Sequence, residues 1–276
     1  PGEYDILAAY TNNIVETDLY SVNNAGTSFA APLVAGGAGL LVDAGKSLYG
    51  GGNAVDARVL KAVLMNSADR FAGWSNGLHN LGGLLVTTQS LDFATGAGRL
   101  DLSTAYTQYT AGTHDVAGLG GGAVSPVGWD YGLVAPGGTN DYFLSMPTPT
   151  GGKFDVTLDW FTDGSLDTNA FTVSYGSFFN LDLEVWLASG GTPVEEIAAS
   201  SSTYNNVELL SFNAPTNGSY VIRVVNKGAV YNFGGNSTNS LTYGLAWSAA
   251  SVPEPTSLVL VATAILGAAA FTRRRG

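Results

Sequence analysis

The stretch NNAGTSFAAPLVAGGAGLL, residues 23–41, decides the fold of the first part of the chain. Two turn-forming asparagines lead into a Gly-Thr-Ser triplet at 26–28, and a run of small apolar residues follows. We expect a helix from about Ser28 to Ala44. Pro32 falls in its first turn, where backbone N–H groups have no intrahelical acceptor, so we expect no hydrogen bond to be lost. The glycines in this run lower helix propensity by up to about 1 kcal/mol each, so we expect burial on every side to offset that cost.

The neighbouring segments predict further elements of an α/β fold. Residues 4–10 have the composition of a strand. A second helix is expected after Asn53, a good N-cap, with Asp56 in the favourable first turn. Residues 95–105 predict a glycine turn, a short strand and a last helical turn. The apolar periodicity of the second helix predicts a buried stripe made of Val55, Val59, Leu60, Val63 and Leu64.

Ser28 lies where a helix begins, and this position suits two roles. The positive end of the helix dipole and a free backbone N–H both favour a nucleophile whose attack creates an oxyanion. Serine is also preferred as an N-cap for purely structural reasons. From Ser28 alone, the structural role is the better interpretation.

The heptapeptide GTSFAAP at 26–32 resembles the nucleophile motif of the subtilisin-like serine proteases, G-T-S-x-[SA]-x-P. Other segments resemble that family in the same order: the strand near the start, the helix AVDARVLKAVLMNSAD and the turn Gly96-x-Gly98-Arg99-Leu100. The resemblance covers about residues 1–106. It implies a partial doubly wound α/β domain over residues 1–108, acyl transfer with Ser28 as nucleophile and no cofactor. It also implies an oxyanion turn formed by Gly26, Thr27 and Ser28.

The sequence departs from that family in its catalytic residues. The family order is Asp, His, Ser, but none of the 27 residues before Ser28 is a histidine. The two histidines, His79 and His114, both follow it, and the family's upstream oxyanion asparagine has no counterpart. His79 lies in a Gly- and Asn-rich loop, where an exposed histidine without a catalytic role is the better interpretation. Because the chain starts at Pro1, we expect a fragment or a product cut from a longer precursor.

From residue 109 to residue 250 the chain changes to strands with period-2 alternation, as in KFDVTLDW, LDLEVWL, NVELLSF, SYVIRVV and LTYGLAW. This spacing predicts an all-β sandwich or jelly roll. The segments are similar to the β-sandwich appended to many secreted subtilases, which implies a role in stability or substrate docking.

Acidic residues collect in this half, and Asp159, Asp163 and Asp182 are candidates for a structural calcium site. The alternative is a solvated acidic strand face, because residues 155, 159, 182 and 184 fall on outward positions. We favour the solvated face.

Residues 251–276 have three parts: Pro-Glu-Pro at 253–255, an apolar run that reaches membrane-spanning length over 256–272, and three arginines. A buried C-terminal helix is the alternative, but core helices rarely end in adjacent arginines. The tail resembles the PEP-CTERM sorting signal of Gram-negative bacteria. That resemblance implies export, transient anchoring in the inner membrane by a transmembrane helix, cleavage by an exosortase at 253–255, and final location at the cell surface or in the extracellular matrix.

Composition limits the remaining classes of function. The 276 residues carry 11 Lys and Arg against 22 Asp and Glu, with no cysteine. An acidic chain without a basic stripe is not expected to bind nucleic acid, and disulfide scaffolds and thiolate metal sites are excluded. The sequence predicts a surface-sorted serine endopeptidase acting on polypeptides. The alternative is a non-catalytic surface protein with a remnant protease segment.

Overall fold

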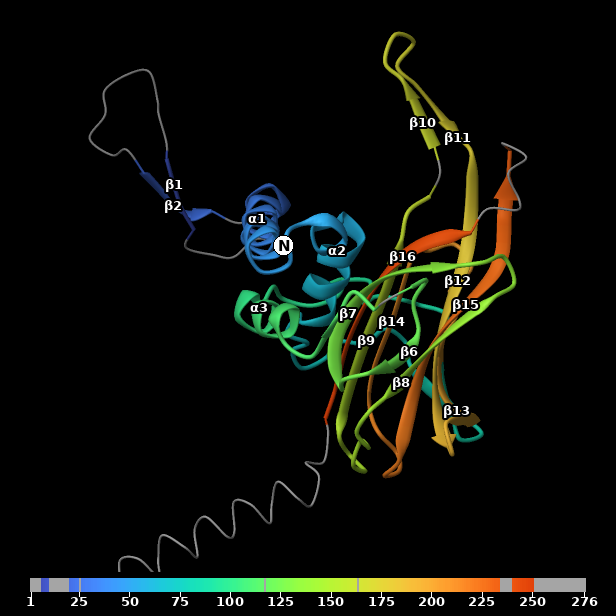
Figure 1. Ribbon diagram of the computed structural model, residues 1–276. Helices are drawn as coiled ribbons and strands as arrows, with labels where there is room; N and C mark the ends of the chain where they lie inside the picture. Colours follow the sequence, from blue (N-terminus) through green and yellow to red (C-terminus); the bar gives the residue numbers. More distant parts are fainter. Residues whose placement is uncertain are drawn as a thin grey trace, which may run out of the picture.

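The computed structural model describes residues 6–9, 20–24, 26–116, 118–162, 164–233 and 240–250. These residues form a mixed α/β structure in which most strands belong to two sheets, with three α-helices on one side (Figure 1). The tail predicted to form a transmembrane helix, 256–272, lies outside the described residues.

The first part contains a two-stranded antiparallel sheet followed by helices. Its elements are β1 Ile6–Ala9, β2 Tyr20–Asn24, α1 Thr27–Tyr49, the 3-10 turn η1 Gly52–Val55, α2 Ala57–Asn66 and α3 Leu102–Thr110. The expected first strand, the two helices and the turn before the last helix are confirmed, although α1 and α3 are longer than expected. The short strand expected within residues 95–105 is not formed, and Arg99 makes only an isolated bridge with Asp69.

α1 differs from the expected helix in the position of Pro32 and in the extent of its burial. The helix begins at Thr27, so Pro32 lies beyond the first turn, and its missing N–H deprives the Ser28 carbonyl of its usual donor four residues on. The expectation that α1 is buried on every side was also wrong. Its buried residues are Gly37, Leu41 and Gly45. An apolar composition predicts burial but not the partner that covers each face, and the described residues cover one face of α1.

The start of α2 differs in a similar way. Its N-cap is Asp56, whose side chain accepts a hydrogen bond from the Arg58 N–H at 3.0 Å, whereas Asn53 lies in the preceding 3-10 turn. Asp56 can make this bond because its backbone is extended (φ −64°, ψ 136°), as N-cap geometry requires. The predicted stripe is confirmed, except that Val55 is half-buried: its buried members are Val59, Leu60, Val63 and Leu64.

The strands form a seven-stranded and a five-stranded sheet. The seven-stranded sheet has the order β3 (His79–Leu81), β4 (Leu84–Thr87), β13 (Thr192–Ser200), β12 (Ser177–Ser189), β15 (Ser219–Asn232), β8 (Thr139–Leu144), β6 (Gly122–Val124). The five-stranded sheet has the order β14 (Val207–Asn213), β9 (Lys153–Trp160), β16 (Leu241–Ala249), β7 (Val127–Val134), β5 (Thr113–His114). β10 (Gly164–Asp167) and β11 (Thr172–Tyr175) form a separate hairpin.

The facing sides of the two sheets share one apolar core, as the period-2 pattern predicts. In β9, all four alternating residues Phe154, Val156, Leu158 and Trp160 are fully buried. Across from them, Leu181, Leu183 and Val185 of β12 and Tyr220, Ile222 and Val224 of β15 are equally buried. Each predicted strand of this half is present as a strand.

The outer side of the five-stranded sheet is covered by α2 rather than by solvent. Lys61 Nζ lies 2.6 Å from Asp159 Oδ1, and Arg70 Nη1 lies 2.8 Å from Asp155 Oδ1. The prediction of a solvated acidic face was therefore wrong at Asp155 and Asp159, and it was also wrong at Asp182, which is buried. Alternation along a strand identifies the side opposite the core, but it does not say whether a helix packs there.

Residues on both sides of position 108 form one packed body. β4, from the first part, pairs in parallel with β13, and α2 packs on β16, β9 and β7. A second core of α1, α2 and α3 residues includes Trp129 and Ala246 from the five-stranded sheet. The division of the chain into domains at residues 108 and 250 stays a prediction.

Candidate active site

Ser28 is exposed in the first turn of α1, and it caps nothing. The N-cap is Gly26, with φ +148°, a backbone conformation that favours glycine. No described side chain caps the helix or places a carboxylate in its first turn. The structural interpretation of Ser28 as an N-cap is therefore contradicted.

The backbone at this end of α1 leaves donors free. The first helical bonds run from the N–H groups of Phe29 and Ala30 to the Gly26 carbonyl, at 3.1 and 3.2 Å. Within the described part of the chain, the N–H of Ser28 has no partner. A helix N-terminus carries a partial positive charge of about half an elementary charge, and this helix is 23 residues long. The residues predicted to form an oxyanion turn, Gly26, Thr27 and Ser28, thus lie together at the start of α1, where Thr27 and Ser28 are exposed.

Neither histidine lies near Ser28. His79 is exposed on β3, with its Nδ1 3.0 Å from the Gly77 carbonyl oxygen. β3 is the edge strand of the seven-stranded sheet, next to β4 and then β13, and Figure 1 shows β13 on the opposite side of the molecule from α1. His79 therefore does not serve as a base for Ser28.

His114 lies at the far end of α1. Its ring centroid is 4.8 Å from that of Tyr49 and 5.8 Å from that of Trp129, and burial lowers its pKa. Tyr49 ends the helix that Ser28 begins, so the helical rise of about 1.5 Å per residue separates them by roughly 30 Å. His114 is part of an aromatic cluster and not of the Ser28 site.

Two glycines hold α1 against α3. A Cβ at Gly37 would overlap the Leu102 side chain, and a Cβ at Gly45 would overlap the Tyr109 hydroxyl. Tyr109 is fully buried; its hydroxyl donates to the Ala54 carbonyl at 2.6 Å. The expected tight burial therefore holds at Gly37, whereas Gly36 and Gly39 face open space.

The Tyr109 contacts connect α1 to the five-stranded sheet. Trp129 of β7 donates its indole N–H to the Tyr109 carbonyl at 2.9 Å, and the two rings stack with centroids 5.5 Å apart. Tyr49 of α1 donates its hydroxyl to the same carbonyl at 3.1 Å. The sequence did not predict this aromatic contact, because aromatic residues at positions 49, 109 and 129 form no pattern that indicates a contact among them.

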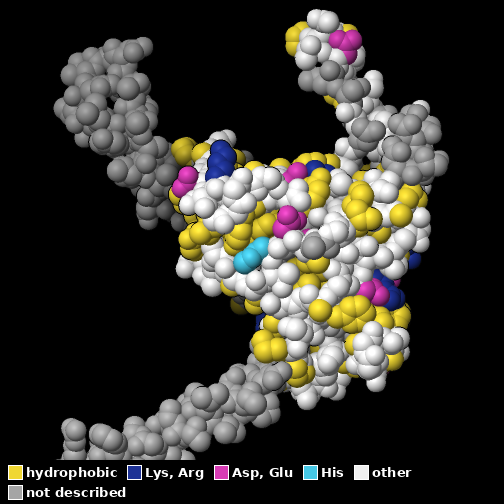
Figure 2. Space-filling view, in the orientation of Figure 1, with side chains coloured by type: hydrophobic (Ala, Val, Ile, Leu, Met, Phe, Trp, Pro, Cys, Tyr) yellow, Lys and Arg dark blue, Asp and Glu magenta, His cyan; other side chains and the backbone are white. Residues whose placement is uncertain are grey.

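The other faces of α1 expose large apolar side chains. Leu40 is 64% exposed and Leu48 is 52% exposed, and Leu33 and Val34 are also exposed. Hydrophobic side chains reach the surface on the side of the molecule that carries α1 and α3 (Figure 2). By length and composition, α1 is also apolar enough to cross a membrane, a test that core helices of soluble proteins pass as well.

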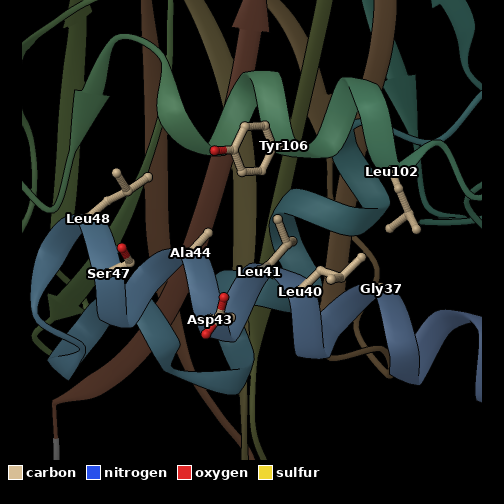
Figure 3. A pocket seen from close by; sticks show the side chains of 9 residues that line it. All are labelled: Gly37, Leu40, Leu41, Asp43, Ala44, Ser47, Leu48, Leu102 and Tyr106. Carbon is tan, nitrogen blue, oxygen red and sulfur yellow. The ribbon is translucent and has the colours of Figure 1, made fainter.

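Two hollows border this surface. One, of about 480 Å³, is lined by residues of the first half of α1 together with Phe71 and the 95–102 segment. The other, of about 390 Å³, lies between α1 and α3; Figure 3 shows Leu40, Leu41, Ala44 and Leu48 along α1, with Leu102 and Tyr106 on α3.

The calcium candidates are not brought together. Asp159 lies on β9 and pairs with Lys61; its burial raises its pKa to about 6 although the Lys61 ammonium opposes the shift. Asp182 lies on β12 in the other sheet, with Lys227 Nζ 3.4 Å from its carboxylate. Asp163 lies outside the described residues. Among the described residues, no three His, Cys, Asp or Glu side chains group as a metal site.

Comparison with known proteins adds a family to part of the chain. No curated protein matches it. Among solved structures, it is similar to CorA, a surface-associated copper-binding protein important in copper acquisition by Methylomicrobium album BG8. That match has 12% identity, covers 44% of this chain and 79% of that chain, and has a TM-score of 0.15, too low to support any inference about fold or copper. The model of the Subtilase family matches residues 3–98, the segment that carries Ser28 and α1.

Proposed function

We propose that this chain carries the nucleophile of an exported subtilisin-like serine endopeptidase, and that Ser28 attacks the carbonyl carbon of a peptide bond. The observation that supports this most strongly is the position of Ser28. Its hydroxyl is exposed at the uncapped, positive end of α1, beside a free N–H, within the segment that matches the Subtilase family.

The reaction requires a general base, and among the described residues no histidine lies near Ser28. Ser28 Oγ forms a bond to the carbonyl carbon while a general base takes its proton, and the oxyanion receives the Ser28 N–H. The C–N bond then breaks, the base returns the proton to the leaving amine, and water hydrolyses the acyl-enzyme. Because His79 and His114 both lie far from Ser28, we propose that the His and Asp of the triad are supplied by residues that are not in this sequence. No cofactor takes part in these steps.

The exposed face of α1 supports the same proposal. In a complete α/β domain, a helix of this composition packs between layers, and Leu33, Val34, Leu40 and Leu48 are the side chains that another layer would cover. The segment that supplies the base would pack on this face.

Substitution of Leu40 by lysine tests this packing. In the chain of residues 1–276, Leu40→Lys is expected to change stability by less than about 0.5 kcal/mol, because the side chain already meets solvent. In the complete product of the reading frame, it is expected to cost about 3 kcal/mol or more, since an unpaired charge would be buried. Denaturant unfolding measures both values, and Leu41→Lys, at a buried position, should destabilise both products. A neutral Leu40→Lys in both products contradicts a covering layer.

The tail and the β-rich half complete the proposal. We propose that 256–272 anchors the chain in the inner membrane of a Gram-negative cell, and that an exosortase cleaves near Pro-Glu-Pro at 253–255 to release it to the surface or matrix. The substrate is a polypeptide. A structural calcium ion would need ligands other than Asp159 and Asp182, because each of these carboxylates is paired with a lysine.

A non-catalytic surface protein is the second candidate, and the absence of a histidine near Ser28 among the described residues favours it. The complete product of the reading frame, incubated with casein, separates the two. The protease proposal expects cleavage that a phosphonylating inhibitor blocks. No cleavage by a folded complete product would support the non-catalytic candidate.

A further inference from the structure

Glu208 is a fully buried carboxyl group at one edge of the five-stranded sheet. Its Oε1 accepts the backbone N–H of Ser202 at 2.7 Å. Its Oε2 accepts the Ser90 hydroxyl at 3.3 Å and makes a very short hydrogen bond with the Ser200 hydroxyl. All four residues are buried, so this is a closed polar cluster between the two sheets.

The cluster contains no cation. Asp182 on β12 is the charged group that acts on Glu208, and it is repulsive; the Lys227 ammonium pairs with Asp182. The other elements packed on β14 present uncharged groups to the carboxyl: β13 contributes Ser200, and β9 contributes Leu158 as its register partner. Burial outweighs the three hydrogen bonds and raises the pKa of Glu208 to about 8.

The cluster joins segment 76–90, which contains β3 and β4, to the β14 edge. Asn76, almost fully buried, donates its side-chain N–H to the Leu209 carbonyl of β14 at 2.9 Å. The Thr87 carbonyl accepts the N–H of Ser201 at 3.0 Å, next to the cluster. Ser90 then reaches Glu208 itself. Asn76 and Ser90 thus attach this segment to the edge of β14, one through a backbone carbonyl and the other through the Glu208 side chain.

We propose that the Glu208 cluster is a pH-sensitive contact. It holds segment 76–90 against β14 while the carboxyl group is neutral and weakens when the carboxyl group ionises. A neutral carboxyl can share hydrogen bonds with two serine hydroxyls at little cost. An ionised one leaves a charge in the core with no counter-ion, beside the negative Asp182. This pH-sensitive contact does not depend on the chemistry of Ser28, so the two proposals can fail independently of each other.

The sign of the pH dependence follows from the folded state holding the proton more tightly than the unfolded chain does. The stabilisation is complete below the unfolded pKa of about 4.5 and is lost as the pH rises through about 8. Between these values, the unfolding equilibrium constant of the full chain is expected to rise about tenfold per pH unit from this group. Asp130 and Asp159 also have pKa values raised to about 6, so the interval from pH 7 to pH 8 isolates Glu208 best.

The test compares the full chain with Glu208→Gln, and with Glu195→Gln as an exposed control on β13 with the same change of charge. Unfolding at pH 5, 7, 8 and 9 is expected to show the alkaline loss in the wild type and in Glu195→Gln, but not in Glu208→Gln. Hydrogen exchange at the Ser202 N–H should accelerate from pH 7 to pH 9 beyond its intrinsic rate change in the wild type. If the Gln variant does not fold, the wild-type profile and this exchange decide alone. Parallel pH profiles, or protection of Ser202 that does not fall with pH, would overturn the proposal.

Discussion

Replacing Ser28 by alanine is expected to abolish hydrolysis by the complete product of the reading frame. In subtilisin itself, loss of the nucleophilic serine lowers kcat by about 10⁶, and a loss of that order is expected for the same role here. The physical reason is that the bond-forming oxygen disappears, while the helix dipole and the backbone donor remain. The measurement is the initial rate of casein cleavage.

A matched control lies on the same helix. Ser47, exposed near the other end of α1, lines the hollow between α1 and α3, and Ser47→Ala should retain full activity. Since Ser28 is exposed and caps nothing, Ser28→Ala should change the free energy of unfolding by no more than about 0.5 kcal/mol. Retained hydrolysis in a folded Ser28→Ala protein would show that another group is the nucleophile.

Gly244→Ala is expected to have the largest effect on stability of any single methyl group added to the helix–sheet interface. Gly244 lies in β16, where α2 crosses the sheet so closely that a Cβ would lie 2.7 Å from the Val59 backbone nitrogen and even closer to the Arg58 carbonyl. Both obstacles are backbone atoms, so no side-chain rotation relieves the overlap. We expect a loss of about 3 kcal/mol, at the upper end of overpacking costs. For a protein of this size, that corresponds to a fall in Tm of roughly 6–12 °C.

The control for Gly244 adds the same methyl group at an open site. Gly39 faces open space on α1, so Gly39→Ala should be neutral or stabilising by up to about 1 kcal/mol, through helix propensity. Thermal unfolding of the two variants and the wild type makes the comparison. A Gly244→Ala protein with an unchanged Tm would mean that α2 is not seated on the sheet as described.

The interface around Gly244 also bears on what the β-rich half does. Below α2, Thr157 donates its hydroxyl to the Asn66 side-chain oxygen at 3.1 Å, and Gln108 donates to the Trp247 carbonyl at 3.3 Å. These hydrogen bonds and the Asp159–Lys61 and Asp155–Arg70 ion pairs form only when the helices pack on the five-stranded sheet in this arrangement. The five-stranded sheet thus supports α2 and α3, which pack on its outer face.

The sequence predicted the elements where local chemistry is sufficient. KFDVTLDW gives β9 with its four inward residues, and GTSFAAP gives the start of α1 with Ser28 exposed at its end. Both depend on periodicity or on a turn, which are encoded within a few residues.

What the sequence did not predict depends on partners that are distant along the chain. The cover over Asp155 and Asp159 comes from α2 and from Arg70 just after it, 85 to 98 residues earlier, and the pairing of β4 with β13 also joins distant segments. The burial of Glu208 in a strand rich in leucine also required the second sheet to be in place. The exposure of Leu40 was not predicted either, because the apolar sequence of a helix does not specify which segment covers each of its faces.

The most direct test of the central claim is to locate covalent labelling by a fluorophosphonate probe, using peptide mass spectrometry on two proteins. These are the chain of residues 1–276 and the complete product of its reading frame. We predict a label on Ser28 in the complete product and none on Ser28 in the chain of 276 residues, because neither of its histidines lies near Ser28. A complete product that folds but is not labelled at Ser28, or a short chain that is labelled there, would contradict it.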